Sequence, residues 1–252
     1  MSQEAIVEAL ARNIRSVQAR IAAAAERAGR NPSQVQLVAV SKTVEPARVI
    51  AACNLGLNVF GENRVEEAAE KIPVIRAELA RQGKELPHWH MIGHLQSRKS
   101  GRALELFDLI HAVDSVRLAE RLSRQATELG KRATVLLELN VSGEESKYGF
   151  PAALTGSVAA QSPALFAAIA AILALPGLDV RGLMTMAPIV PAPEEARPYF
   201  RRLREWRDAL QDRFPAHGWP ELSMGMTDDF EVAVEEGATM VRIGRAIFTC
   251  CS

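Results

Sequence analysis

Short apolar runs alternate with longer amphipathic stretches along almost the whole chain. The runs lack the every-second-residue alternation of a half-exposed strand, so they predict strands that are buried on both faces. Eight such strands are predicted, at Leu37–Val40, Leu57–Phe60, Trp89–Ile92, Leu109–Val113, Val135–Val141, Leu178–Met184, Leu222–Met224 and Met240–Ile243.

The stretches outside these runs have the spacing of helices. The first helix, over residues 4–28, precedes all the strands, and Gly29 and Pro32 end it. Its apolar positions recur at steps of three or four residues, at Ile6, Leu10, Ile14, Val17 and Ile21. Seven further helices are predicted at 46–55, 63–82, 96–106, 115–130, 150–174, 194–214 and 228–236.

Buried strands that alternate with helices are typical of a parallel sheet covered by helices. Eight such units after one additional helix predict a closed (β/α)8 TIM barrel, and the length of 252 residues agrees with it. An open doubly wound sheet is the alternative. No Pro-, Gly- or Ser-rich linker divides the chain, so residues 1–252 are predicted to form a single domain. The Pro188–Pro193 stretch is expected to be a loop over the barrel mouth.

The charge balance narrows the possible functions. Thirty basic and thirty acidic residues give a formal net charge of zero, whereas nucleic-acid and anionic-membrane binding call for a basic surplus. The N-terminus lacks the apolar core of a signal peptide, and the longest apolar run, Ala164–Leu175, is too short to span a bilayer. Cys53, Cys250 and Cys251 suggest neither a disulfide framework nor a zinc site. We expect a cytoplasmic protein that binds neither nucleic acid nor membrane.

Lys42 directly follows the first predicted strand, in the sequence LVAVSKT. Barrel chemistry takes place at the C-terminal ends of the strands. We expect the barrel mouth to desolvate Lys42 and so to favour the neutral amine, the form that makes Schiff bases with aldehydes. The alternative is a solvated lysine that begins a loop. The other five lysines lie in polar or loop-like sequence contexts, at Lys71, Lys84, Lys99, Lys131 and Lys147.

The last two predicted strands end in LSMGMTDD and MVRIGRAIF, and TIM barrels often bind phosphate with the loops at these positions. Gly225 and Gly244 would let backbone N–H groups approach an anion, and a helix beginning after each strand would add its positive dipole end. Ser223 offers a hydroxyl, and Arg242 or Arg245 offers charge-assisted hydrogen bonds. The alternative is that the two glycines only turn the chain.

The position of the last strand connects these loops to the lysine. Strands one and eight are neighbours in a closed barrel, so a phosphate bound after strands seven and eight would hold an attached aldehyde near Lys42. This combination predicts pyridoxal 5′-phosphate as the ligand.

Several motifs occur in a fixed order: GENRV, IGHLQ, GLMTMAP, and SMGM followed by DD and VRIG. Through these motifs the chain, from about residue 35 to 249, resembles the pyridoxal phosphate homeostasis protein family. The resemblance implies a barrel like the N-terminal domain of bacterial alanine racemase, with the cofactor on Lys42. It also implies phosphate contacts at Ser223, Gly225, Gly244 and Arg245, and pocket positions for Asn63, His90, Met224 and Arg242.

Two departures bear on these implications. Position 245 is arginine where many relatives carry a small hydroxyl residue, so a side-chain hydroxyl contact with the phosphate is lost there, while the backbone N–H stays available. Racemases and decarboxylases of this fold append a large β-domain, and a partner subunit completes their site. Because this sequence ends at Ser252, we expect no such domain after Phe248.

Arg242 also bears on turnover. Met240, Arg242 and Gly244 alternate along the last strand and are predicted to face the barrel interior. A permanently charged Arg242 opposite the pyridine nitrogen would disfavour protonation of that nitrogen and weaken it as an electron sink. We therefore expect a protein that holds the cofactor but turns over amino acids poorly.

Two other groups of polar residues have competing interpretations. His88, His90 and His94 have a spacing that can suit zinc, but no nearby carboxylate completes a site, and a polar role for His90 at the barrel mouth is favoured. Glu62 and Asn63 could orient the imine or bind the ring hydroxyl, or cap the helix that begins at Arg64.

Acidic and arginine-rich segments are interpreted as structural. Asp228 and Asp229 are expected to be charges at a helix N-terminus. A helix over 194–214 carries acidic residues among its arginines, which predicts a solvated face with ion pairs rather than a docking surface for an acidic partner. Those arginines are Arg197, Arg201, Arg202, Arg204, Arg207 and Arg213.

Three functions remain in competition. The favoured one is a non-catalytic, monomeric protein that buffers pyridoxal phosphate or delivers it to apo-forms of pyridoxal phosphate enzymes. The second is a pyridoxal phosphate-dependent amino-acid racemase. The third is a Schiff-base aldolase or another phosphate-substrate enzyme that uses Lys42 without a cofactor.

Overall fold

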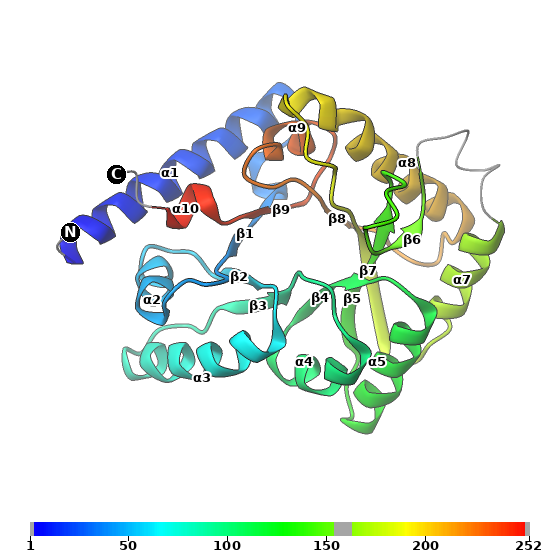
Figure 1. Cartoon of the computed structure of the whole chain (residues 1–252), viewed down its shortest axis with the longest axis horizontal. Coiled ribbons are helices and arrows are strands. Elements are labelled where there is room, and N and C mark those ends of the chain that lie inside the picture. Colours follow the sequence, from blue (N-terminus) through cyan, green and yellow to red (C-terminus); the bar gives the residue numbers. More distant parts are fainter. Residues whose placement is uncertain (1–2, 154–162, 250–252) are drawn as a thin grey trace.

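Eight parallel strands follow one another around a closed barrel (Figure 1). The structure, a computed structural model, describes residues 3–153 and 163–249. The pairing of β4 with β5 closes the ring, and β1 pairs with β9, so the predicted TIM barrel is confirmed and the open sheet is excluded. The barrel strands are β1 (Gln36–Val40), β2 (Val59–Glu62), β3 (His88–Met91), β4 (Leu109–Val113), β5 (Ala133–Asn140), β7 (Leu178–Met184), β8 (Glu221–Ser223) and β9 (Met240–Ile243).

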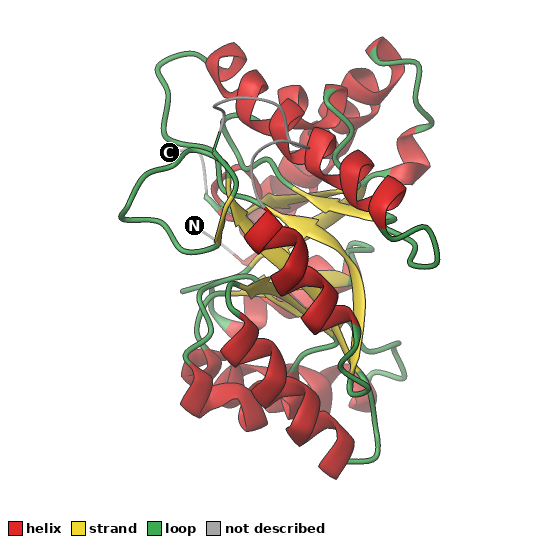
Figure 2. Ribbon diagram, turned by 90° about the vertical axis from the view of Figure 1, so that its right-hand side faces the viewer, coloured by secondary structure: helices red, strands yellow, loops and turns green. Residues whose placement is uncertain are grey.

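Helices form a layer outside the strands (Figure 2). The predicted additional N-terminal helix is present as α1. The helices of the described residues are α1 (Gln3–Arg27), α2 (Pro46–Asn54), α3 (Val65–Arg81), α4 (Ser100–Leu106), α5 (Val116–Glu128), α7 (Pro163–Leu173), α8 (Arg197–Arg213), α9 (Phe230–Glu235) and α10 (Arg245–Phe248).

The predicted start of the helix over residues 150–174 is wrong. Phe150–Pro151 form a short strand, β6, beside the end of β5, and the Ala152 N–H donates to the Asn140 carbonyl. These bonds hold the segment extended and compete with helix formation. The helix α7 begins at Pro163, where a missing N–H costs nothing. Residues 154–162 lie outside the described residues, as do Cys250, Cys251 and Ser252.

The strands separate two apolar cores because successive side chains point to opposite faces. On β1, Val38 faces the barrel interior, whereas Leu37 and Ala39 pack against the helices. The outer core contains the large aromatic side chains, including Phe60 and Trp89, whose ring centroids lie 5.5 Å apart. The interior core is smaller, and polar side chains complete it toward one end of the barrel.

Helix α1 packs against α9 and α10, the two helices that follow the last two strands (Figure 1). The predicted apolar stripe faces this contact: Leu10, Ile14, Val17 and Ile21 are buried, and Ile6 is half-buried. Beside the stripe, the Arg20 guanidinium lies 2.9 Å from Glu231 and 4.6 Å from the centre of the Phe230 ring.

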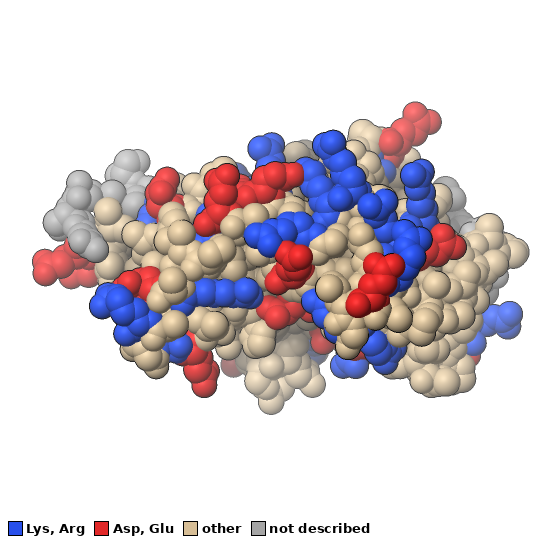
Figure 3. Space-filling model, turned by 90° about the horizontal axis from the view of Figure 1, so that it is seen from below, with Lys and Arg blue, Asp and Glu red and all other residues tan. Residues whose placement is uncertain are grey.

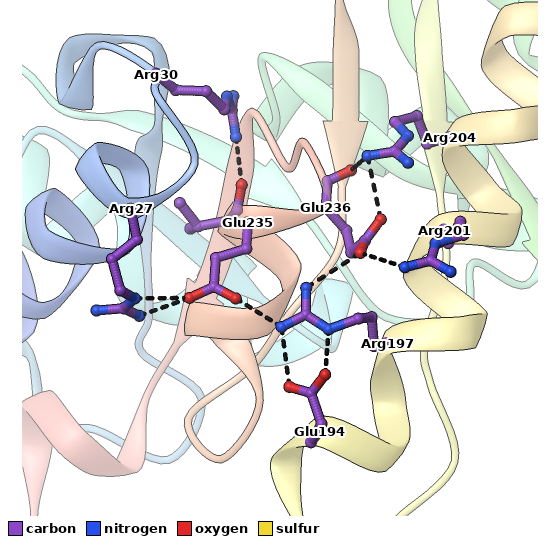
Figure 4. A network of polar contacts seen from close by, with 9 residues as sticks. Arg27, Arg30, Glu194, Arg197, Arg201, Arg204, Glu235 and Glu236 are labelled. Carbon is purple, nitrogen blue, oxygen red and sulfur yellow. Dashed lines mark hydrogen bonds and ion pairs between the residues drawn. The ribbon is translucent and has the colours of Figure 1, made fainter.

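The arginines of α8 form ion pairs, as predicted, and most of these reach Glu235 and Glu236 at the end of α9 (Figure 4). Two pairs lie along α8 itself, Arg202 with Glu205 and Arg207 with Asp208. Arg197 contacts Glu235 at 2.6 Å and Glu236 at 3.1 Å, and Arg201 and Arg204 also contact Glu236. Glu235 binds Arg27 of α1 at 2.7 Å, so the network joins three helices.

The prediction of a solvated side chain is wrong for Arg202. Its Nε donates to the Ala153 carbonyl at 3.1 Å, and its guanidinium lies over the Trp206 ring, which buries it.

The face of the molecule seen in Figure 3 carries charges of both signs, as the net charge of zero suggests. Within the part of the chain that the structure describes, no helix has the length and apolarity needed to cross a bilayer. Cys53 is a free, half-buried thiol.

Truncation of the α1 stripe is expected to destabilise the fold. Ile14→Ala removes a side chain that is 3% exposed, which should lower the free energy of unfolding by about 2–5 kcal/mol in urea titrations. Ile189→Ala is the matched control, since Ile189 is fully exposed and its loss should change the free energy by less than about 0.5 kcal/mol. Equal unfolding midpoints for the two variants would contradict the packing described for α1.

Candidate functional site

Lys42 lies in a tight turn at the carboxyl end of β1. The Val44 N–H donates to the Ser41 carbonyl at 3.0 Å, with Lys42 and Thr43 at the centre of the turn. Thr43 has φ +61°, a left-handed conformation that strains a β-branched residue by about 1–3 kcal/mol. The Lys42 side chain is exposed. The expected desolvation of Lys42 is therefore wrong, because burial ends at Ser41, the first residue of the turn, and Lys42 lies beyond it.

The final strand lies next to this turn, as predicted. In the β1–β9 register, Val38 is opposite Arg242 and Ala39 is opposite Ile243. Gly244 follows, and a Cβ placed on it would lie 3.0 Å from the Val40 carbonyl oxygen, so glycine permits this close approach. Lys42, Gly244 and Arg245 line the same surface pocket of about 280 Å³.

Position 225, in the loop after β8, requires glycine for structural reasons. Its φ is +91°, and a Cβ would lie 2.6 Å from the Cβ of Ala233 and 2.9 Å from the Cα of Phe230. The conformation and the packing against α9 therefore both require glycine, as the chain-turning alternative supposed. Helices do begin after β8 and β9, as predicted, although α9 and α10 are short. A phosphate contact at Gly225 stays a prediction.

The two aspartates after β8 have different roles. Asp229 is the N-cap residue of α9, and its Oδ1 accepts a hydrogen bond from the Met226 N–H at 2.6 Å. This agrees with the predicted place at a helix N-terminus. Asp228 instead forms an ion pair with Arg245, which connects the loop after β8 to the loop after β9.

Arg242 faces the barrel interior, as its alternation with Met240 predicted. It is buried, and it donates from Nη1 to Ser223 Oγ at 2.6 Å and from Nη2 to the Thr185 carbonyl at 2.9 Å. Burial lowers the pKa of Arg242 to about 10, although Glu138 and Asp229 oppose this shift. Arg242 thus stays charged at neutral pH, and Ser223 Oγ is already engaged within the barrel.

A pair of buried histidines extends this array. Nδ1 of His111 lies 2.9 Å from Ser223 Oγ, and Nε2 of His111 lies 3.0 Å from His90 Nδ1. Burial lowers the pKa of His90 to about 4 and places the pKa of His111 well below its usual value. With both rings neutral, the hydrogen bonds can all run in one direction. Arg242 donates to Ser223, the Ser223 hydroxyl donates to His111 Nδ1, and His111 Nε2–H donates to His90 Nδ1. His111 was not singled out from the sequence, although its place within the strand LIHAV could have revealed an interior position.

The remaining predicted residues have less decisive positions. Asn63 is half-buried at the end of β2, and the N-cap residue of α3 is Arg64, so the helix-cap alternative for Asn63 is wrong. Met224 is fully buried in the outer core, and its N–H donates to the Met240 carbonyl at 3.1 Å. Cofactor contacts by Asn63 and Met224 stay predictions.

The three histidines of the H-x-H-x3-H spacing separate in the structure. His90 turns inward to His111, whereas His88 lies 3.7 Å from Asp108. His94 lies 3.0 Å from Asp114 and stacks on Tyr148, with ring centroids 3.7 Å apart. Among the described residues, no group of histidine, cysteine and acidic side chains could hold a metal ion.

Lys71 does not lie in the polar, loop-like context that the sequence suggested. It is buried on α3, 7% exposed, and its Nζ lies 2.9 Å from Glu62 and 2.7 Å from Glu67. Sequence spacing could not show this, because the decisive partner, Glu62, belongs to β2.

Comparisons with known proteins identify relatives over most of the chain. The family model described as alanine racemase, N-terminal domain, matches residues 7–251. A pyridoxal phosphate homeostasis protein of Aquifex aeolicus is 42% identical over 91% of this chain and 92% of its own. One from Pseudomonas aeruginosa is 43% identical over 95% of this chain and 94% of its own.

The chain belongs to the pyridoxal phosphate homeostasis protein family. A solved structure agrees: PipY of Synechococcus elongatus with pyridoxal phosphate bound superposes with a TM-score of 0.77. It is 37% identical, and the match covers 95% of this chain and 99% of that one.

The described residues fit the cofactor named for this family. Lys42 offers an exposed amine for an aldehyde, and Gly244 brings a close-packed backbone to the same pocket. Behind them, Arg242 holds a positive charge inside the barrel. Glu138 of β5 is also buried there, and its Oε2 has no hydrogen-bond partner among the described residues. Sequence reasoning missed Glu138, whose position within the apolar strand VLLEL was a signal.

Glu138 should make stability depend on pH. Burial, with a contribution from Asp114, raises the pKa of Glu138 to about 7 despite Arg242. The folded protein therefore holds this proton more tightly than the unfolded chain, and stability falls as pH rises from the unfolded pKa near 4.5 to about 7. Glu138→Gln should remove this loss, so that between pH 5 and 8 its stability relative to wild type rises by about 2–3 kcal/mol.

Urea unfolding at the two pH values provides the measurement. The histidine contributions are common to both proteins and cancel in the difference. Glu85→Gln, at an exposed position, is the control and should show no such change. A pH-independent difference between Glu138→Gln and wild type would refute the buried, protonated carboxyl.

Proposed function

We propose that this protein binds pyridoxal 5′-phosphate as a Schiff base on Lys42 and takes part in intracellular pyridoxal phosphate homeostasis, by buffering or delivering the cofactor, without robust amino-acid turnover. One observation carries the proposal: the β1–β9 pairing places the exposed Lys42 amine in the same pocket as Gly244 and Arg245. The names of the homologues and the pyridoxal phosphate bound to PipY support the choice of ligand.

The proposed contacts divide by the part of the cofactor that they serve. The phosphate is assigned to the loops after β8 and β9, and the ring to the polar end of the barrel interior. When bound, the cofactor supplies the aldehyde, and Lys42 supplies the amine that attacks it. The residues proposed for the phosphate are Ser223, Gly225, Gly244 and Arg245, and those proposed around the ring are Asn63, His90, Met224 and Arg242.

An exposed tether suits a carrier. Water and other amines can reach Lys42 in its turn, so the covalent bond to the aldehyde can be reversed without opening the barrel. We propose that residues 1–252 act as one domain, as a monomer in the cytoplasm, and that apo-forms of pyridoxal phosphate enzymes receive the cofactor.

Substitution of Lys42 should abolish covalent binding. Pyridoxal phosphate is added to the pure protein, the adduct is reduced with borohydride, and peptides are analysed by mass spectrometry. Wild type should carry the reduced adduct on Lys42, and Lys42→Ala should carry none. Lys84→Ala, which removes an exposed lysine elsewhere, should behave as wild type. An adduct retained at full level in Lys42→Ala would refute the assignment.

An amino-acid racemase is the second candidate, because the family model that covers the chain is that of the alanine racemase N-terminal domain. The family name supports the carrier function instead. The permanent charge of Arg242 inside the barrel agrees with weak carbanion chemistry, provided that it faces the pyridine nitrogen.

Turnover can be measured directly. The protein loaded with pyridoxal phosphate is incubated separately with L- and D-amino acids, and the products are resolved by chiral chromatography. We expect enantiomeric purity to decay no faster than with Lys42→Ala under the same conditions. Rapid racemisation that depends on Lys42 would establish the enzyme and overturn the carrier proposal.

A further inference from the structure

A buried ammonium group lies directly behind the Lys42 turn. Nζ of Lys71 is within hydrogen-bond distance of the Ser41 carbonyl at 2.8 Å, Glu62 Oε1 at 2.9 Å and Glu67 Oε1 at 2.7 Å. An ammonium has three N–H donors, so each of them has an oxygen acceptor. Lys71 is thus fully engaged by groups from β2, from α3 and from Ser41, which directly follows β1.

Two of these acceptors control the backbone on either side of Lys42. The Ser41 carbonyl precedes Lys42 and accepts from Lys71, while Glu67 Oε1 also accepts from the Thr43 N–H at 2.5 Å. Ser41 Oγ donates to Glu62 Oε1 at 2.8 Å. Lys42 therefore lies between the Ser41 carbonyl and the Thr43 N–H, and the same charged cluster binds both of these groups.

The conformation that this cluster holds is a strained one. Thr43 keeps its positive φ only while the surroundings over-determine it. The Thr43 hydroxyl contributes only a local bond, to the Lys42 carbonyl at 2.6 Å. Among the hydrogen bonds of the described residues, the Thr43 N–H reaches beyond the turn to Glu67 and so connects Thr43 to α3.

The charges of the cluster depend on Lys71. Glu62 is fully buried, and burial raises its pKa despite the contacts with Lys71 and Ser41. For Glu67, burial acts in the same direction, but the hydrogen bonds from Lys71 and the Thr43 N–H outweigh it, and the pKa is lowered. Without Lys71, two neighbouring carboxyl groups would lose their shared cation, and Glu67 would lose the ion pair that fixes it beside Thr43.

We propose that Lys71, Glu62 and Glu67 form a positioning cluster that fixes the Lys42 turn and so presents the Lys42 amine to an aldehyde. Lys71 itself forms no covalent bond. This inference rests on the proposed function, because it assigns the cluster a role in covalent capture at Lys42.

The test compares three variants with wild type. Lys71→Met removes the buried ammonium and retains most of the side-chain volume. Lys71→Met combined with Thr43→Gly keeps the cluster broken but removes the strain, since glycine adopts positive φ readily. Lys99→Met is the matched control, because Lys99 also pairs with a glutamate of α3, Glu66, and lies outside the cluster.

Two measurements report on the turn. Without cofactor, amide hydrogen exchange at Thr43 should be roughly tenfold faster in Lys71→Met, because the cluster no longer fixes the Glu67 acceptor of the Thr43 N–H. A tenfold change in rate corresponds to about 1.4 kcal/mol. With pyridoxal phosphate, the rate of borohydride-trapped adduct formation at Lys42 should fall roughly tenfold in Lys71→Met. Thr43→Gly should restore most of that rate, and Lys99→Met should match wild type in both measurements. A purely structural role for Lys71 would not predict rescue by a change in the turn.

Each outcome has a separate meaning. If wild type forms no adduct on Lys42, the proposed function fails, whatever Lys71 does. If wild type forms the adduct and Lys71→Met forms it at the same rate, the positioning cluster alone is refuted.

Glu67→Ala provides a second route if Lys71→Met does not fold, since Glu67 is only partly buried. It removes the partner of the Thr43 N–H and leaves the contacts of Lys71 with Ser41 and Glu62 possible. It should also slow trapping, and an unchanged rate would refute the cluster as well.

Discussion

The pairing of β1 with β9 is the constraint on which the candidate site depends. It joins segments at opposite ends of the sequence and sets the Lys42 turn beside Gly244. Closing so long a stretch of chain costs conformational entropy, which the contacts made on closure must offset. Helix α1 contributes from outside, because its apolar stripe and Arg20 bind the helices that follow β8 and β9. The additional helix thus stabilises the part of the barrel where the chain closes.

The sequence was most informative where local pattern alone determines the structure. The strands at Leu109–Val113, Leu178–Met184 and Met240–Ile243 have the predicted bounds, because predominantly apolar runs of this length have few alternatives to a buried strand. The proximity of Lys42 to Gly244 followed from strand order and closure. The contacts predicted for individual cofactor atoms are not determined by strand order, since they depend on side-chain geometry around a ligand.

The failures share a different cause: they involve side chains whose partners come from other elements. Lys71 and Arg202 were interpreted from their sequence neighbours, yet both are buried by contacts with distant segments. Lys42 was expected to be desolvated because of its place at the barrel mouth, but the conformation of the turn decides its exposure. His111 and Glu138 were hidden within apolar strands, where a single polar residue is easily taken for part of the run. An inward-facing polar residue in such a strand was the available signal.

Lys71 has a consequence for how this protein meets a reactive aldehyde. Two primary amines lie close to the same stretch of backbone, since Lys71 binds the carbonyl of the residue that precedes Lys42. Their chemistry differs because of what surrounds them. Lys42 is exposed to incoming molecules. Lys71 can react only after its three hydrogen bonds to oxygen atoms of a buried cluster are broken. The fold thereby provides chemoselectivity between two otherwise identical functional groups, and it directs the aldehyde to one nitrogen by occupying the other.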